Sequence, residues 1–283
     1  MKNLKAITLL FLGLILLACS SDDNGDGTNA PLTGDYFPSA MTNLWIYNVQ
    51  NRNADDSMFD FDATDLMTIS SSTASSFTLE ANSGTNPAAG SMNSFLVNGS
   101  LSKTDDMLLF SGDLELPVEF SGFSDETITL TDVALYSLNA ENGELSNTSG
   151  TINQDLDLDG TVFPLTIDYT FITSKLSTGS TLTVDGTEYS DVIKGNLRLE
   201  IEVTASIEIF GTVNNIDVLN TQDILSIDYY FSQDIGLIKA DAVQGYAVAQ
   251  TFLDIIGPLG ITLDIPTTIS VTNNQEIDSF VIN

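Results

Sequence analysis

Apolar and polar residues alternate along much of the chain. The clearest run is Leu197 to Ile209, where every second residue is apolar and all the residues between them are polar or charged. Successive side chains of a strand point to opposite faces, so the run predicts an antiparallel strand with one buried face. Its length favours a strongly curved sheet. Weaker or shorter strand patterns occur at 44–49, 66–69, 77–81, 95–101, 114–120, 128–130, 163–171, 224–231, 237–239 and 277–282.

Turn and helix signals complete this pattern. Asp159-Gly160 and Asp185-Gly186 each separate two strand patterns, and Asp-Gly favours the tight turn of a hairpin. Ser70–Ser76 and Ala81–Ser94 have the composition of loops. The helical signal is confined to Ala247–Ile256, which ends at Gly257-Pro258. The predicted fold is therefore mainly β: a curved antiparallel sheet, as a half-barrel or open barrel, with one short helix near residues 247–256.

The N-terminal residues have the pattern of an export signal. Lys2 and Lys5 precede the uncharged stretch Ala6–Leu17, which is too short to span a bilayer as a helix. The following Leu16-Leu17-Ala18-Cys19 resembles the bacterial lipobox, and this resemblance implies that Cys19 is acylated and becomes the first residue of the mature chain. The alternative is an ordinary signal peptide followed by an unrelated cysteine.

These features suggest three parts: a signal peptide at 1–18, an acylated cysteine with a flexible acidic tether at 19–34, and a single all-β domain at 35–283. The tether contains no aromatic residue and has too little apolar surface to fold. Its acidic start resembles that of Bacteroidetes-type surface lipoproteins. The resemblance implies a lipid-anchored protein of the outer membrane, at the cell surface in preference to the periplasmic face.

Composition excludes several classes of function. The chain has 39 acidic and 8 basic residues, for a net charge of −31. Removing Lys2 and Lys5 with the signal leaves 6 basic residues and a charge of −33. Such a chain is unsuited to nucleic acid, whose phosphates need clustered Lys and Arg. With no histidine and one cysteine, it also has no His-based catalytic triad, His-ligated zinc site or intramolecular disulfide.

One acidic motif is a candidate Ca²⁺ site. Asp155, Asp157 and Asp159 alternate before Gly160, as hard oxygen ligands do at the start of an EF-hand-like loop. The twelfth position of such a loop is Thr166, where a bidentate glutamate is required. The favoured alternative is a hairpin whose aspartates face solvent. The sequence implies no other cofactor.

Several short motifs together resemble a group of uncharacterised bacterial lipoproteins. They are Tyr36-Phe37-Pro38, Asn43–Tyr47, the Gly186 to Lys194 stretch, Tyr229–Phe231 and Asp234–Lys239. That group is similar to the half-barrels of lipoprotein carriers, which implies a sheet wrapped around an apolar concavity. Residues 51–150 are outside the resemblance.

The resulting hypothesis is a non-enzymatic, membrane-anchored lipoprotein that binds an apolar or amphiphilic molecule, such as a lipid, in a curved sheet. A second hypothesis is a surface adhesion or glycan-capture component that binds through loops 82–94 and 139–150, and a third is a carboxylate-based hydrolase. Trp45, Tyr47, Tyr229 and Tyr230 either line a groove or, as we favour, pack in the core. The sequence assigns no ligand-binding residue and no oligomeric state.

Overall fold

The computed structural model describes residues 33–116, 126–158, 161–209, 211–261, 263 and 265–283. All of them belong to one compact unit, Thr33–Asn283. Its strands are β1 (Leu44–Asn53), β2 (Phe61–Ser72), β3 (Ser76–Ala81), β4 (Gly99–Lys103), β5 (Met107–Glu115), β6 (Thr127–Ser137), β7 (Gly143–Leu158), β8 (Thr161–Val184), β9 (Thr187–Ile209), β10 (Thr212–Ser232), β11 (Gly236–Ala247) and β12 (Thr268–Val281). Its helices are α2 (Ser91–Val97), α3 (Gln250–Ile256) and the 3-10 turns η2 (Ser57–Phe59), η3 (Asn82–Gly84) and η5 (Gly257–Leu259).

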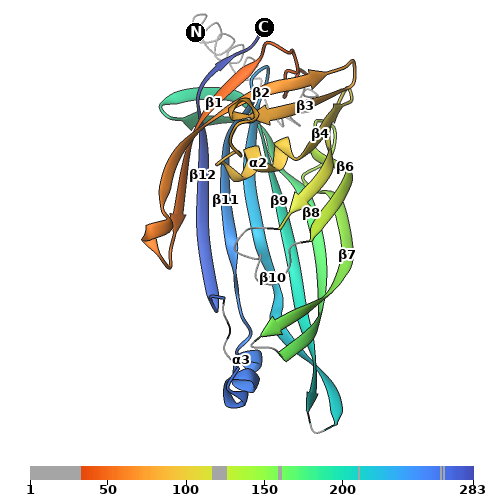
Figure 1. The fold of residues 1–283 in the computed structure, drawn as a ribbon. Coiled ribbons are helices and arrows are strands. Elements are labelled where there is room, and N and C mark those ends of the chain that lie inside the picture. Colours follow the sequence, from red (N-terminus) through yellow and green to blue (C-terminus); the bar gives the residue numbers. More distant parts are fainter. Residues whose placement is uncertain (1–32, 117–125, 159–160, 210, 262, 264) are drawn as a thin grey trace, which may run out of the picture. The chain divides into compact units, whose positions relative to one another are not determined.

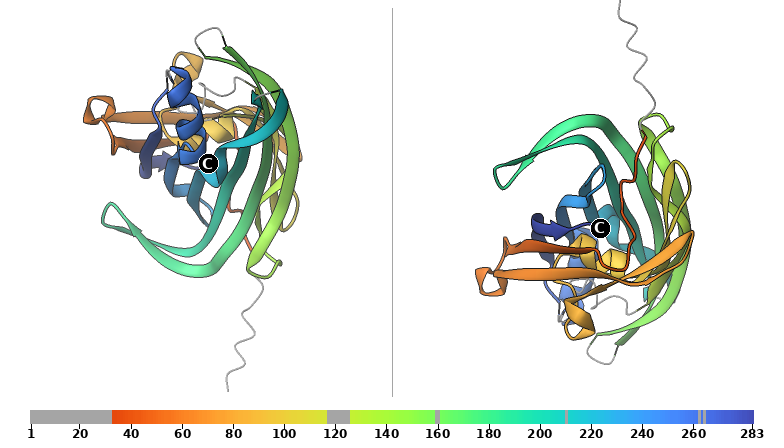
Figure 2. Two further views of the ribbon diagram at one scale, coloured as in Figure 1. Left: turned by 90° about the horizontal axis from the view of Figure 1, so that it is seen from below. Right: turned by 90° about the horizontal axis from the view of Figure 1, so that it is seen from above.

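The strands form one antiparallel sheet that is nearly closed into a barrel (Figures 1 and 2). Its order is β6-β5-β4-β3-β2-β1-β12-β11-β10-β9-β8-β7, so strands that follow one another in the chain are paired, except β6 and β7, and β1 pairs with β12. The longest strands, β8, β9 and β10, have 24, 23 and 21 residues. They confirm the predicted curved sheet, because register shifts interrupt their ladders and allow the strands to bend.

Helix α2 and the segment around Phe37 occupy the concave side of the sheet. Phe95 of α2 contacts Phe110 of β5 and Phe171 of β8, with ring centroids 4.2 and 6.1 Å apart. Phe37 packs against Trp45 and Phe231 at 5.4 and 5.8 Å. Both phenylalanines are almost fully buried. The chain's own aromatic side chains therefore fill these parts of the concavity.

Helix α3 follows β11 and packs on the sheet through its apolar face. Phe252 is completely buried and lies 6.4 Å from the ring of Phe163. This agrees with the helix predicted for 247–256, although it begins at Gln250. Among the described residues, no helix is long and apolar enough to cross a membrane.

The edges of the sheet, β6 and β7, meet without a continuous backbone ladder. Side chains make the seam instead: Ser146 Oγ accepts from the N–H of Ala134 at 2.9 Å, and Thr173 Oγ1 donates to the carbonyl of Ala134 at 2.7 Å. Tyr229 donates to the carbonyl of Leu135 at 2.6 Å. Backbone groups of β6 that a closed barrel would pair with another strand are thus partly satisfied by hydroxyls.

The structure corrects three local expectations. The interval Ser70–Ser76, expected to be a loop, includes the end of β2 at Ser72 and the start of β3 at Ser76. The weak strand pattern at 95–101 is wrong, because Ser91–Val97 is helical and a strand begins only at Gly99. The interval 81–94, expected to be a loop, contains η3 and the first residues of this helix. The Asp185-Gly186 turn is confirmed, with φ of +45° and +79° and Val184 paired to Thr187.

Candidate ligand-binding groove

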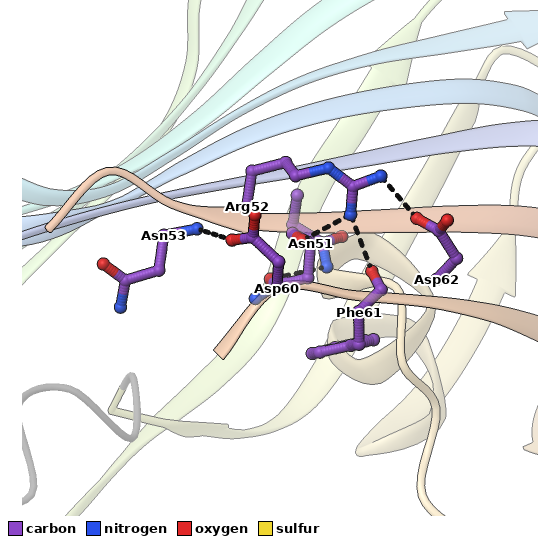
Figure 3. Close-up of polar contacts among 7 residues, drawn as sticks. Asn51, Arg52, Asn53, Asp60, Phe61 and Asp62 are labelled. Carbon is purple, nitrogen blue, oxygen red and sulfur yellow. Dashed lines mark hydrogen bonds and ion pairs between the residues drawn. The ribbon is translucent and has the colours of Figure 1, made fainter. Parts of the chain in front are cut away.

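The hairpin connecting β1 and β2 has a tip rich in aspartate. Asn53 Oδ1 accepts from the N–H groups of Asp55 and Asp56, at 2.9 and 3.0 Å, and the Asp56 carboxylate accepts from the N–H of Met58 at 2.9 Å. Asp60 Oδ1 in turn accepts from the N–H of Asn53 at 2.7 Å (Figure 3). These bonds cap η2 and give the tip a fixed shape.

The tip is also bonded to the neighbouring strand β12. Ala54 donates its N–H to the carbonyl of Ser270 at 2.9 Å, and the N–H of Ser270 donates to the carboxylate of Asp55 at 3.0 Å. On the hairpin, Arg52 donates to the carbonyls of Asn51 and Phe61 and pairs with Asp62 at 2.5 Å (Figure 3). The hairpin is therefore positioned by bonds to both of its own strands and to β12.

Three large apolar side chains are exposed on this rigid tip. The exposed fractions are 88% for Met58, 64% for Phe59 and 44% for Phe61. Single exposed apolar residues are common, but three grouped within four positions are typical of an interaction surface.

These side chains line a groove of about 540 Å³. Pro266, Ile269 and Val271, which belong to β12 and the segment before it, line the same groove. Val271 is buried and Ile269 half-buried, and Asn51 and Phe61 are paired across the β1–β2 ladder. Asn51 and Val271 lie in the same alternation as the buried residues Val49 and Asn273, so the groove is on the concave face of the sheet.

The groove also has a small polar part, formed by Asn51, Asn53 and Asp60. Asn51 Oδ1 accepts from Asn273 Nδ2 at 3.3 Å, and Asn53 Oδ1 holds the tip as described above. Within the described part of the chain, the side-chain amide nitrogens of Asn51 and Asn53 donate no hydrogen bond. An apolar wall with a few free polar groups is the usual composition of a small-molecule site.

A buried polar network supports the inner end of the groove. Asp65, which is fully buried, accepts from the N–H groups of Ala89 and Gly90, each at 2.8 Å, and from Asn93 Nδ2 at 3.0 Å. Gln275 Nε2 donates to Asn93 Oδ1 at 2.9 Å. Asn273 continues the network to the carbonyl of Ala89, so β1, β2, β12 and the start of α2 are held together there.

A second, smaller hollow of about 390 Å³ lies beside loop 84–88. Its walls include Leu79, Ala81 and Val97 together with residues of that loop. It is part of the 82–94 region that the adhesion hypothesis singled out. The other region, 139–150, is largely strand, because β7 begins at Gly143.

All six basic residues of the chain beyond the signal have partners within the described structure. Arg52, Lys103, Lys194 and Arg198 pair with Asp62, Asp35, Asp228 and Asp223, and Lys239 pairs with both Asp241 and Glu276. The sixth, Lys175, is buried and donates to the carbonyls of Leu138 and Ala140 at 3.1 and 2.7 Å. No unpaired cation is therefore available in this part of the chain to receive an anionic group.

The structure places the predicted Ca²⁺ ligands in and next to a hairpin. Asp155 is exposed on β7 and paired with Pro164, and Asp157 is paired with Val162, while Asp159 lies outside the described residues. Among the described residues, no three acidic or other metal-ligating side chains are placed so that they could hold a metal ion. The ladder from Asp155 to Leu158 has the extended form that the hairpin alternative requires. Ca²⁺ binding stays a prediction.

Cys19, the predicted lipidation site, also lies outside the described residues. Of the four aromatic residues weighed as a groove, Trp45, Tyr47 and Tyr229 are buried in the core, as the packing alternative expected. Tyr230 lies on the other face, with the Lys194 ammonium 5.3 Å from its ring centroid. Sequence reasoning did not identify the groove, and the signal that it missed is the placement of Met58, Phe59 and Phe61 among aspartates.

Comparisons of the chain with protein-family models, curated proteins and solved structures found no match.

Proposed function

We propose that this protein is a lipid-anchored outer-membrane lipoprotein that binds an amphiphilic molecule non-enzymatically in the groove between the β1–β2 hairpin and β12. The observation that carries the binding proposal is the grouping of exposed Met58, Phe59 and Phe61 on a capped tip, in a groove that Ile269 and Val271 also line. Burying this apolar surface against a ligand would stabilise the complex by about 25 cal/mol for each Å² removed from water. A volume of about 540 Å³ is within the range of small-molecule sites.

The position of the groove suits a tethered protein. The described chain starts next to the β10–β11 turn, where the N–H of Asp234 donates to the carbonyl of Asp35 at 2.7 Å and Lys103 pairs with Asp35. Strand β1 begins near that end of the sheet at Leu44 and reaches the groove at Asn53. The groove is therefore at the end of β1 opposite the point where the proposed tether would join the domain.

The binding proposal is tested with residues 33–283, which form a compact unit containing the complete sheet. Decyl maltoside, a neutral amphiphile, is titrated below its micellar concentration by calorimetry. We expect saturable binding that Phe59→Ser weakens at least about tenfold, because the substitution removes about half of the exposed aromatic wall. Val213→Ser is the matched control, since Val213 is a 67% exposed apolar residue at the β9–β10 turn. Equal binding by both variants, or no binding by the unchanged protein, would overturn the proposal.

The anchoring proposal concerns Cys19 and is tested separately. In an outer-membrane-bearing bacterium that expresses the whole chain, labelled fatty acid is expected to be incorporated into the protein and lost in Cys19→Ser. The unchanged protein should fractionate with the outer membrane, because several acyl chains hold a protein stably where one does not. Incorporation into Cys19→Ser would contradict lipidation at this residue. Digestion by protease added to intact cells would support the cell-surface orientation, and protection would contradict it.

A further inference from the structure

We infer that the groove accepts amphiphiles whose head group carries N–H or O–H donors and no negative charge, with a preference for an amine. The inference rests on the proposed function and adds a head-group class to it. It follows from three observations: a carboxylate lies in the polar part of the groove, the hairpin has a net negative charge, and the basic residues of the described chain are bonded to other partners.

The polar part of the groove contains one acid and no base. Asp60 lines the groove and is held in place by the N–H of Asn53, which donates to Oδ1. Asn51 and Asn53 also line it, and their side-chain N–H groups can donate to the oxygen of a neutral hydroxyl or amide. A carboxylate beside an amphiphile's head favours an ammonium and repels a carboxylate or sulfate.

The surrounding hairpin has the same sign of charge. Residues 51–62 include four acids, Asp55, Asp56, Asp60 and Asp62, and one base, so their net charge is −3. The one base, Arg52, is paired with Asp62 and donates to two backbone carbonyls. It is not among the residues that line the groove. No cation therefore offsets the Asp60 carboxylate within the groove.

The domain offers no alternative cation that could move to the groove. Apart from Arg52, the basic residues of the described chain lie on other strands and are bonded there to carboxylates or backbone carbonyls. An anionic head group in the groove would face Asp60 and the remaining aspartates of the hairpin without compensation. A neutral polyol head avoids this repulsion, and an ammonium turns it into attraction.

The experiment compares three molecules with the same decyl chain: decylamine, decyl maltoside and decanoate. Each is used below its micellar concentration to displace the neutral fluorescent probe N-phenyl-1-naphthylamine from residues 33–283. We expect decylamine to bind at least about fivefold more tightly than decanoate at low salt, and the ratio to fall in concentrated salt, where exposed charges are screened. Decyl maltoside should lie between them or equal decylamine.

Asp60→Asn tests the assignment of the carboxylate. The variant keeps an oxygen that can accept from the N–H of Asn53, so the tip should keep its shape. We expect it to lose most of the preference for decylamine while binding decyl maltoside unchanged. Glu208→Gln, on β9, which is three strands from β12 and five from β2 in the sheet order, is the matched removal of an exposed acid and should keep the preference.

The outcomes separate the two proposals. If decyl maltoside binds and decanoate binds as tightly as decylamine, the head-group inference is wrong and the groove remains an amphiphile site. If Asp60→Asn and Glu208→Gln have the same preference as the unchanged protein, the inference is also wrong. If none of the three molecules displaces the probe, the proposed function itself fails. It also fails if the molecules displace the probe from Phe59→Ser as readily as from the unchanged protein.

Discussion

Lys175 is a buried lysine beside the β6–β7 seam. Its ammonium is buried and donates to the carbonyls of Leu138 and Ala140, so it connects β8 to the chain that follows β6. Burial lowers the pKa of Lys175, and the charge of Glu141 opposes this effect. The folded protein therefore gives up the proton more readily than the unfolded chain does.

This difference predicts how stability changes with pH. Between the lowered folded pKa and the usual value of about 10.5, the unfolded chain binds more protons, so the contribution of Lys175 to stability rises with pH. The unfolding free energy of the unchanged protein relative to Lys175→Met should then increase from about pH 8 to about pH 10. Urea unfolding at the two pH values measures it.

Lys239→Met provides the contrast for this measurement. Hydrogen bonding to Glu276 and the charge of Asp241 raise the pKa of Lys239 despite its partial burial. With the folded pKa raised and the unfolded one near its ordinary value of about 10.5, the amine is mostly protonated in both states up to about pH 10, so the free energy lost in Lys239→Met should change little between the two pH values. A constant difference for Lys175→Met as well would contradict the account of its burial.

Sequence reasoning anticipated the residues of the core better than those of the groove. Trp45 and Tyr229 were expected to pack and do so, because buried aromatics on alternating strand positions leave a clear pattern. Met58 and Phe59 were not noticed, because they lie in a turn without periodicity. Only the long-range pairing of β1 with β12 brings them into the same groove as Ile269.

At the scale of elements, the β6–β7 seam is the part of the sheet where backbone pairing gives way to side-chain bonds. Thr173 is fully buried and its hydroxyl bonds the carbonyl of Ala134 at 2.7 Å. In Thr173→Val the shape is retained and the donor is lost, which should cost about 1–2 kcal/mol of unfolding free energy. Amide hydrogen exchange should increase most in β6, because local opening begins where bonds are fewest.

Thr166→Val is the control for the seam. Thr166 is on the same strand, and its hydroxyl donates to the side chain of Asn153 at 3.3 Å in an exposed position. Its replacement should change stability by less than about 0.5 kcal/mol. Equal effects of the two substitutions would show that the seam does not depend on the Thr173 bond.

The elements also show why prediction succeeded unevenly. Parts of the long strands β8 to β10 alternate regularly, so strands could be predicted at 163–171, 197–209 and 224–231, whereas register shifts break the alternation elsewhere. Helix α2 could not, because it is only 7 residues long and follows a stretch of Ser, Asn and Gly. Its buried residues Met92, Phe95 and Leu96 do have helical spacing, but the tertiary contacts to β5 and β8 stabilise it more than its propensity does.

At the scale of the whole molecule, buried tyrosines couple the fold to alkaline pH. Burial raises the pKa of Tyr36 to about 12, with a further contribution from Asp191 and Asp234, and it raises the pKa of Tyr47, Tyr136 and Tyr229 as well. Above pH 10 the unfolded phenols lose protons that the folded ones keep. Stability should therefore fall with rising pH, by roughly 1.4 kcal/mol per pH unit for each buried phenol.

Phenolate absorbance and circular dichroism followed together measure this effect. The four buried tyrosines should ionise in the same transition in which the β signal is lost. Tyr36→Phe should shift this transition to higher pH, because it removes one of the groups that ionise on unfolding. Ionisation of all tyrosines near pH 10 in a folded protein would contradict the burial of these four side chains.

The fold class could be predicted for the molecule as a whole, but the pairing of the first strand with the last could not. Alternation and Asp-Gly turns indicate antiparallel hairpins, and neither reports that β1 pairs with β12 from Leu44↔Val281 to Asn53↔Val271. This long-range pairing brings residues 51–61 and 266–271 together and creates the groove. Local sequence patterns do not specify such contacts.

The central claim is that an amphiphile binds with its chain between Phe59 and Ile269. The most direct measurement is the broadening of backbone amide NMR signals of residues 33–283 by an amphiphile that carries a nitroxide on its alkyl chain. The account predicts broadening centred on residues 51–61 and 266–271, and its loss when unlabelled decyl maltoside is added. Broadening centred on loop 84–88 or near Trp45, or no competable broadening at all, would contradict the account.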